Sequence, residues 1–470
     1  MLRRLVILMT VLVIAIPLLF YSFQYFSRAG SIKANIVVDA TKTSGSFSDR
    51  WKALSQGGEE AGVRMLENVL PQVSGIYPKY IRIDHIYDYY NVVSRNSSGN
   101  LNFDFSKLDQ TVCDIYHTGA KPFFALGYMP ETMSIDGSLI GRPKSWNEWT
   151  FLVQKTVEHY SNKDMVLFCG NLEEFWKTDI YYEVWNEPDG ENFGKWTVGG
   201  NKSYSDLYFY SVKGAQQAQN VLPFKIGGPA TTSLYKNWTQ GLLDFIIANN
   251  LRIDFISWHH YSKKTDDYTS DIIKLNKWLG EDPKYLPYEN LPKIISEWGY
   301  DSEKNSIADT EIGSAYTIAS LRNIINARLE LAFLFEIKDG PSSPSWGILS
   351  YDGKEKPRYQ ALKLLNLLEG DQLMVDGEGS NVSAIASKTD NQITLIMTNY
   401  DESDRNYEVV PVTFQNLDGI NYTLTKKYLD GRSETELNLQ TIDSQIVLEN
   451  ERAVVMQPNT VISVQLTKTQ

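Results

Sequence analysis

The sequence predicts an α/β protein, a (β/α)₈ barrel with a C-terminal β-sandwich, preceded by an N-terminal transmembrane anchor. Three observations lead to this prediction: an apolar N-terminal segment, eight short apolar runs that alternate with helical stretches, and a C-terminal part rich in β-branched residues. Of the 470 residues, 42% are hydrophobic and 22% are charged, as is usual for a folded globular protein. This composition excludes a disordered chain, a collagen-like fibre and a multispan membrane protein.

The net charge and the number of cysteines exclude some classes of binding partner and some kinds of site. A net charge of −12 repels nucleic acid and anionic polymers, so we expect no nucleic-acid partner. Two cysteines, Cys113 and Cys169, cannot form a disulfide framework, and neither belongs to a C-x-x-C pattern. Both lie in apolar stretches, and we expect packed thiols rather than a bridge between them.

Residues 1–30 predict a membrane signal. Arg3 and Arg4 precede an uncharged apolar run from Leu5 to Phe26, which as a helix spans about 33 Å, close to the thickness of a bilayer core. A cleavable signal peptide has a shorter apolar region and a small-residue cleavage site, so we predict an uncleaved anchor, with a cleaved signal as the alternative. Because the arginines stay inside, the protein would be anchored by a single pass with the rest of the chain outside the cytoplasm, or secreted after cleavage.

Residues 41–368 predict the barrel. The expected strands are 51–56, 80–84, 122–127, 181–185, 225–228, 255–258, 293–296 and 331–335. Helical stretches such as 105–119 and 206–220 separate them, which indicates parallel βα units, and a count of eight favours a closed barrel. An open doubly wound sheet would alternate in the same way, but the sequence has no dinucleotide-binding glycine fingerprint and no phosphate-binding loop.

Residues 369–470 predict the β-sandwich. Segments in this part alternate β-branched side chains with turn residues, a texture typical of antiparallel sheets. Residues 31–40 are also strand-like, and we expect them to join the sandwich from the other end of the chain.

Two glutamates at predicted strand ends are the candidate catalytic residues. Glu187 follows the fourth strand and Glu297 ends the seventh, which places them on nearly opposite sides of the barrel mouth, where barrel enzymes carry their active sites. Such a pair can cleave a glycosidic bond, one as the acid that protonates the leaving oxygen and the other as nucleophile or base. A single glutamate at a strand end is commonly a surface or capping group, but two, each near a tryptophan, favour catalysis.

Other polar groups gather at the same predicted edge. Arg82 and Asp84 end the second strand with His85 just beyond, and His259 and Tyr261 end the sixth. A zinc site is an alternative for these histidines, but no H-x-x-x-H helix supports it. We therefore expect no metal, and expect these groups to hydrogen-bond a sugar or the nucleophile.

Glu183 precedes Glu187 by four positions and shares its inward parity along the strand. We interpret it as a buried structural carboxylate paired with a base such as Arg82. Aromatic side chains near strand ends could stack on the apolar face of a sugar: Tyr128, Trp185, Trp298 and Trp346.

Several motifs together carry a resemblance to a known family. They are KYIRIDHIYD at the second strand, KPFFALGYMPE at the third, YEVWNEPD at the fourth, DFISWHHYS at the sixth and IISEWGY at the seventh. The chain resembles glycoside hydrolase family 39, whose members are (β/α)₈ retaining glycosidases with a C-terminal β-sandwich. The resemblance covers nearly everything after residue 30.

The resemblance implies a role for each matching position. Glu187 corresponds to the general acid/base and Glu297 to the nucleophile of a double displacement with retention. Asn186 matches the residue that binds the sugar's 2-hydroxyl, and Arg82 matches an arginine beneath the carboxylates. His259 and Tyr261 match polar residues that line the subsite and support the nucleophile. The carboxyl groups are expected about 5–5.5 Å apart, and the chemistry needs neither a metal nor an organic cofactor.

Two departures from the family affect the substrate. Xylosidase-like members carry a histidine soon after the second-strand arginine, where this chain has Ile83, Asp84 and His85. The eighth strand continues through Glu336 into Lys338 rather than ending in a Trp-Thr-Phe-like run, and looks closer to exopolysaccharide glycosidases that cleave within a chain.

The sequence therefore predicts a retaining glycosidase that acts on a cell-envelope or extracellular polysaccharide. An exo-acting β-xylosidase on oligosaccharides is the alternative within the same class. A catalytically inactive, membrane-tethered polysaccharide-binding or assembly protein is the alternative of another class, and the intact pair of Glu187 and Glu297 argues against it.

Overall fold

A computed structural model of the chain describes residues 31–57, 60–61, 63–167, 169–341, 345–431 and 435–469. These residues form two compact units. The first unit is Ser46–Leu367, and the second combines the N-terminal segment up to Gly45 with Leu368–Gln470.

The prediction of a membrane-anchored protein is corrected. Among the described residues no helix is both long and apolar enough to cross a bilayer. The expected anchor at 1–30, on which the prediction depended, lies outside the described residues.

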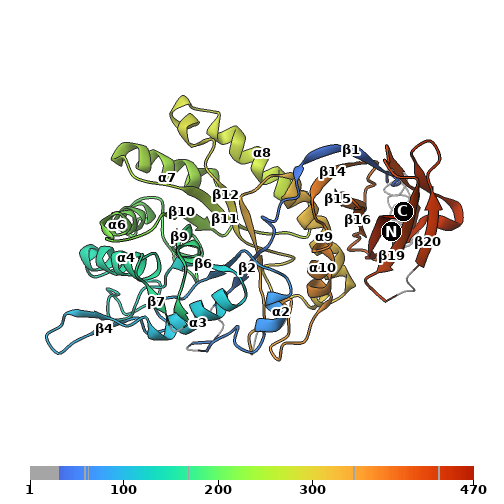
Figure 1. Ribbon diagram of the computed structural model, residues 1–470. Coiled ribbons are helices and arrows are strands. Elements are labelled where there is room, and N and C mark those ends of the chain that lie inside the picture. Colours follow the sequence, from blue (N-terminus) through green and yellow to red (C-terminus); the bar gives the residue numbers. More distant parts are fainter. Residues whose placement is uncertain are drawn as a thin grey trace, which may run out of the picture. The chain divides into compact units, whose positions relative to one another are not determined.

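The first unit is a closed barrel of eight parallel strands in the described part of the chain, in the order β10-β11-β12-β13-β2-β3-β6-β9 (Figure 1). The strands are β2 (Ala53–Gln56), β3 (Tyr80–Ile83), β6 (Lys121–Leu126), β9 (Ile180–Val184), β10 (Phe224–Thr231), β11 (Phe255–Tyr261), β12 (Lys293–Gly299) and β13 (Leu331–Phe335). The predicted barrel is confirmed. β10, β11 and β12 each continue three residues beyond the predicted end, because residues at their ends still pair with the neighbouring strand.

Helices lie outside the strands in Figure 1. They are α2 (Leu70–Ser74), α3 (Ser106–His117), α4 (Trp146–Tyr160), α5 (Glu174–Lys177), α6 (Tyr204–Gln217), α7 (Lys236–Asn249), α8 (Asp267–Leu279), α9 (Glu311–Asn326) and α10 (Pro357–Leu365). Side-chain caps fix where several begin: Ser145 accepts from the amide of Glu148 at α4, and Ser203 from that of Asp206 at α6. Short hairpins β4 (Val93–Arg95) with β5 (Leu101–Phe103), and β7 (Val166–Leu167) with β8 (Gly170–Asn171), extend the loops of the unit.

The barrel interior changes from apolar to polar along the strands. One cluster of buried residues fills the part near the strand starts: Ala53, Phe123, Tyr181, Phe255, Ile294, Leu331 and Phe333. Side chains alternate along a strand, so the residue two positions further on faces the interior as well. On β2, β9, β11 and β12 that residue is Ser55, Glu183, Ser257 and Ser296, all of them buried. The polar half of the interior lies directly beneath the ends of the strands.

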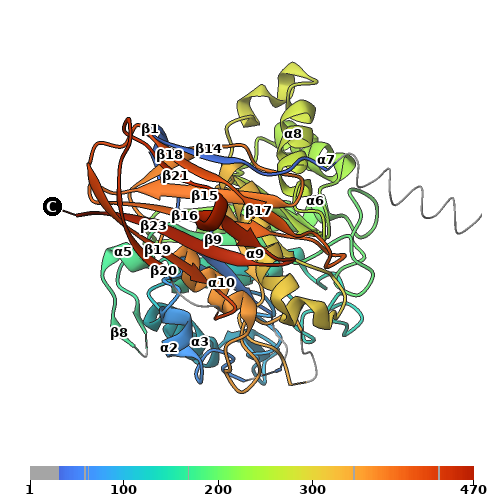
Figure 2. The same cartoon turned by 90° about the vertical axis from the view of Figure 1, so that its right-hand side faces the viewer.

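The second unit is mostly β-sheet. Its described residues form a nine-stranded sheet in the order β20-β19-β23-β16-β15-β14-β1-β18-β21, and β17 pairs with β22 (Figure 2). The strands are β1 (Ile36–Ser46), β14 (Asp371–Asp376), β15 (Val382–Lys388), β16 (Gln392–Asn399), β17 (Glu408–Val410), β18 (Val412–Gln415), β19 (Asn421–Tyr428), β20 (Thr435–Gln440), β21 (Ile446–Leu448), β22 (Val454–Met456) and β23 (Val461–Thr469). β1 runs parallel to β18, with Ile36 opposite Val412, and its Ile36 and Val38 belong to the core of this unit.

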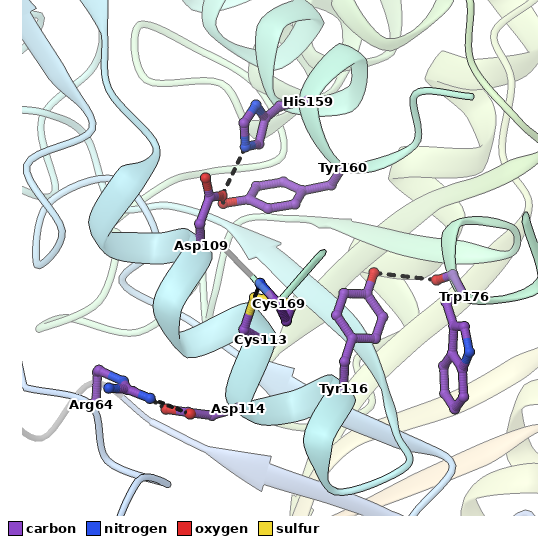
Figure 3. The surroundings of a disulfide bond; sticks show 9 residues. All are labelled: Arg64, Asp109, Cys113, Asp114, Tyr116, His159, Tyr160, Cys169 and Trp176. Carbon is purple, nitrogen blue, oxygen red and sulfur yellow. Dashed lines mark hydrogen bonds and ion pairs between the residues drawn. A yellow bond between two sulfur atoms is a disulfide. The ribbon is translucent and has the colours of Figure 1, made fainter. Parts of the chain in front are cut away.

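The expectation of two packed thiols is wrong, because Cys113 and Cys169 form a disulfide (Figure 3). The bridge joins α3 to the residue that precedes β8, with the two Cα atoms 5.6 Å apart. Fifty-six positions separate the two cysteines in the sequence, so only the fold brings them together. Near the bridge, Tyr116 of α3 donates its hydroxyl to the carbonyl of Trp176, which ties α3 to α5 as well.

Candidate active site

The backbone at two strand ends positions the predicted catalytic glutamates. Glu187 follows β9 with φ of 44°, and Trp185 before it has φ of 73°, a left-handed region that residues other than glycine seldom adopt and that is enriched at functional sites. The amide of Glu187 donates to the carbonyl of Ala230 at 3.0 Å and holds this turn. On β12 the pairing register shifts around Ser296, and such bulges commonly re-aim a side chain toward a site.

Arg82 on β3 connects the strands that carry the two glutamates. Its Nε donates to Glu183 Oε2 at 2.8 Å, one Nη to Glu297 Oε1 at 2.7 Å and the other to Asn186 Oδ1 at 2.7 Å. The predicted pairing of Glu183 with Arg82 is confirmed. Burial lowers the pKa of Arg82, but Glu183 and Glu297 outweigh burial and raise it, so the guanidinium stays charged.

Glu297 is held at both carboxylate oxygens. Arg82 occupies Oε1, and the hydroxyl of Tyr261 donates to Oε2 at 2.7 Å. The side chain is buried, with 8% of its surface exposed. Burial raises the pKa of Glu297 above its ordinary value, although His259 and Arg82 act in the opposite direction.

His259 lies between the two glutamates. Its Nδ1 is 2.9 Å from Glu187 Oε1 and 3.4 Å from Glu297 Oε2. Burial lowers the pKa of His259, but the carboxylates of Glu297 and Glu187 outweigh it, and the pKa is raised above the ordinary value for histidine. One oxygen of each glutamate and a ring nitrogen of His259 all lie within 4.8 Å of one another.

That separation alone would suit a metal ion. However, the oxygens of Glu297 already accept hydrogen bonds from Arg82 and Tyr261, and Glu187 Oε1 lies at hydrogen-bond distance from His259. The guanidinium supplies a fixed positive charge where a cation would otherwise bind. The donor set therefore suits hydrogen-bonded carboxylates better than metal ligands.

Asn186 extends the site toward the end of β3. Its Nδ2 donates to the hydroxyl of Tyr128 at 2.8 Å and contacts Asp84 Oδ2 at 3.4 Å. Asp88 accepts the amide of Tyr128 at 3.0 Å and lies 2.6 Å from His85 Nδ1. Asp84, His85 and Tyr128 thus lie together, as the sequence predicted, and Asp88, which also follows the second predicted strand, fixes two of them.

The predicted aromatic contacts are only partly available to a ligand. Trp298 is fully buried and packs on Tyr268 and Tyr316, so the expectation that its ring stacks on a sugar is not met. Trp185 is likewise fully buried. A strand-end position does not say on which side of the strand a ring lies. Trp346 is half-buried, with its ring 6.1 Å from that of Phe335.

Glu336 is a buried carboxylate that the sequence analysis noted only as a departure from the family. It follows β13 directly and lies close enough to Tyr261 to contribute, after burial, Glu297 and Glu187, to the raised pKa of that hydroxyl.

Comparison with known proteins agrees with this geometry. The family model of glycosyl hydrolases family 39 matches residues 34–438. The chain belongs to this family. It is 27% identical to a beta-xylosidase of Caldicellulosiruptor saccharolyticus over 367 residues, which are 72% of this chain and 71% of the relative. It is 24% identical to a beta-xylosidase of Geobacillus stearothermophilus over 327 residues, 63% of this chain and 62% of that one.

Solved structures share the fold of this family 39 protein. A monomeric beta-xylosidase from Caulobacter crescentus CB15 superposes with a TM-score of 0.73 at 18% identity, covering 93% of this chain and 100% of that structure. A family 39 enzyme from Xanthomonas axonopodis pv. citri gives 0.73 at 18% identity, covering 93% and 98%. The family resemblance read from the sequence is therefore confirmed, and the protein is a glycosidase that acts on a carbohydrate.

Proposed function

We propose that this family 39 glycosidase works with retention of configuration, with Glu297 as nucleophile and Glu187 as general acid/base. The observation that carries the proposal is the approach of their carboxylate oxygens to within 4.8 Å. Retaining glycosidases hold the two carboxyl groups about 5–5.5 Å apart, whereas inverting ones leave about 6.5–9.5 Å for a water molecule.

The reaction then proceeds in two displacements. In the first, an oxygen of Glu297 bonds to the anomeric carbon, the bond from that carbon to the leaving oxygen breaks, and Glu187 gives its proton to that oxygen. In the second, a water molecule gives a proton to Glu187 and its oxygen bonds to the anomeric carbon, which releases the Glu297 carboxylate. Each residue ends as it began.

The neighbours of the two glutamates support these roles. Arg82 and Tyr261 fix the orientation of Glu297, so that less freedom is lost when it attacks. His259, at 2.9 Å from Glu187, stabilises the carboxylate that remains after Glu187 has given up its proton. An inactive binding protein would not need this full arrangement, so we favour the enzyme.

Two substrate classes follow. The relatives at 27% and 24% identity carry the name beta-xylosidase, which makes a β-xyloside the first candidate. The chain after β13, where the buried Glu336 stands in place of the family's usual run, favours a polysaccharide cleaved internally as the second. The prediction of an envelope polysaccharide as the substrate depended on the membrane anchor, and with that anchor corrected we no longer favour it over other polysaccharides.

The test uses the full chain as wild type, Glu297→Gln and Glu187→Gln, with a nitrophenyl β-xyloside, xylo-oligosaccharides and a neutral polysaccharide. We expect Glu297→Gln to lower kcat/KM by roughly 10³ or more, since no covalent intermediate can form. Glu187→Gln should lose roughly 10²–10⁴ on xylo-oligosaccharides and much less on the nitrophenyl xyloside, whose leaving group needs little protonation.

Proton NMR of the first-formed product decides the stereochemistry. A β-anomer released from a β-xyloside supports retention, and an α-anomer contradicts it. Release of monosaccharide assigns exo action, and release of oligosaccharides from the polysaccharide assigns internal cleavage.

A further inference from the structure

We propose that Glu183 is a positioning residue for the reaction, which acts on Glu297 through Arg82 from a small hydrated chamber beneath the active site. This inference rests on the proposed role of Glu297 as nucleophile.

The first observation is the shared guanidinium. Glu183 lies on β9, four positions before Glu187, and none of its surface is exposed. Its Oε2 accepts from Arg82 Nε at 2.8 Å, while the same guanidinium donates to Glu297 Oε1 at 2.7 Å. Arg82 is therefore divided between two buried carboxylates, and the charge of Glu183 limits how far Arg82 can favour the ionised form of Glu297.

The second observation is a group of buried polar atoms without a protein partner. Within the described residues, Glu183 Oε1 has no hydrogen-bond partner, and neither do the hydroxyls of Ser55, Ser257 and Ser296. Each of the four residues lies two positions beyond a member of the apolar interior cluster, on β2, β9, β11 and β12. They therefore stand in the same polar part of the barrel interior.

A buried carboxylate oxygen with no partner is costly, and proteins commonly satisfy such groups with ordered water that makes about three hydrogen bonds. Across the strands, Glu183 is opposite Ala125 and Gly227, which offer no polar side-chain atom. We assign water to the space between Glu183 Oε1 and the serine hydroxyls. Hydrogen bonds from this water would satisfy the carboxylate oxygen of Glu183 that Arg82 leaves without a partner.

Other titratable groups face Glu297 and Glu183. Around Glu297 they are Arg82, Asp84, Tyr128, Glu187, His259 and Tyr261, and Glu336 faces Tyr261. Besides Arg82, the group that faces Glu183 is Tyr204, whose hydroxyl donates to the carbonyl of Val184 at 2.8 Å. Within this set, Glu183 is the carboxylate that bonds to Arg82 from below the mouth of the barrel. A substitution of Glu183 therefore keeps the polar groups at the mouth, which would contact a sugar.

The test is the pH dependence of kcat/KM for Glu183→Gln on a nitrophenyl glycoside. Without the charge of Glu183, the only carboxylate among the described residues that forms an ion pair with Arg82 is Glu297, and Arg82 then favours the ionised form of Glu297 more strongly. We expect the acidic limb of the profile to move to lower pH by about one unit and kcat to fall about tenfold, because the nucleophile becomes less basic. Glu183→Asp, which keeps the charge, should leave the limb near its wild-type position.

Asp114→Asn is the matched control. Asp114 is also a buried carboxylate bonded to an arginine, Arg64, but it lies on α3 outside the barrel. Loss of thermal stability in both variants with a shifted acidic limb only in Glu183→Gln supports the proposal. An unshifted limb in an active Glu183→Gln enzyme would overturn it.

A crystal structure of the wild-type protein at high resolution tests the chamber without any variant. Water bonded to Glu183 Oε1 and to at least one of Ser257 and Ser296 is expected, and a dry space would refute the chamber. Failure of this inference differs from failure of the proposed function, in which the first-formed product would be the inverted anomer or Glu297→Gln would keep the wild-type kcat/KM.

Discussion

His259 illustrates how single residues depend on one another in the site. Its ring is fully buried, yet it lies within 3.4 Å of an oxygen of both Glu187 and Glu297, and these carboxylates raise its pKa. A group whose pKa is higher in the folded state stabilises the fold below its unfolded value of about 6.5, and this contribution is lost as the pH rises through the folded value.

The free energy of unfolding should show this dependence. We expect the difference between wild type and His259→Gln to be largest near pH 6 and to decrease as the pH rises above it. Urea unfolding of both proteins between pH 6 and pH 9 measures the difference. A difference that stays constant over this range would mean that His259 contributes no proton-linked stability.

Residue by residue, the sequence predicted the composition of the site better than its geometry. Arg82, Asn186, His259 and Tyr261 lie with the two glutamates because all of them stand at or near the carboxyl ends of strands of one closed barrel. Trp298 ends the same strand as Glu297 but faces the surrounding helices. The register shift at Ser296 decides which side chain faces inward, and no pattern in the sequence marks it.

At the scale of elements, the barrel strands were predictable because strands buried on both faces appear as short apolar runs. The ends of these strands were harder to predict, since the functional residues of β11 and β12 are polar but still pair with the adjacent strand. The disulfide was not predictable, because it depends on the contact between α3 and the segment before β8.

That disulfide should stabilise the protein without affecting catalysis. Replacing both Cys113 and Cys169 by serine opens a loop of more than fifty residues, and the chain-entropy estimate for such a loop is about 4 kcal/mol. We expect a lower Tm by calorimetry and an unchanged kcat/KM at 25 °C, because α3 lies outside the strands that carry the site. Adding a reductant to the wild type should lower its Tm as well, and should leave the double variant unchanged.

At the scale of the whole molecule, the barrel unit is inserted in sequence between two parts of the other unit. β1 lies between β14 and β18 in the nine-stranded sheet, with Ile36 and Val38 fully buried. Without β1 the sheet would lose an inner strand, and the unpaired backbone groups of two strand edges, on β14 and β18, would be exposed.

A chain that begins at residue 47 should therefore lose the fold of the second unit. We expect limited proteolysis to degrade residues after 368 in this shortened chain but not in a chain that begins at residue 31, which keeps β1. Equal resistance of the two chains would show that β1 is dispensable.

The place of β1 also constrains how the protein matures during synthesis. Residues 47–370, which are 324 residues, must leave the ribosome after β1 and before its neighbour β14. At translation rates of about 5–20 residues per second, β1 waits roughly 15–65 s for a partner. The barrel can fold in that interval, while the unpaired β1, whose first residues are apolar, stays available to chaperones.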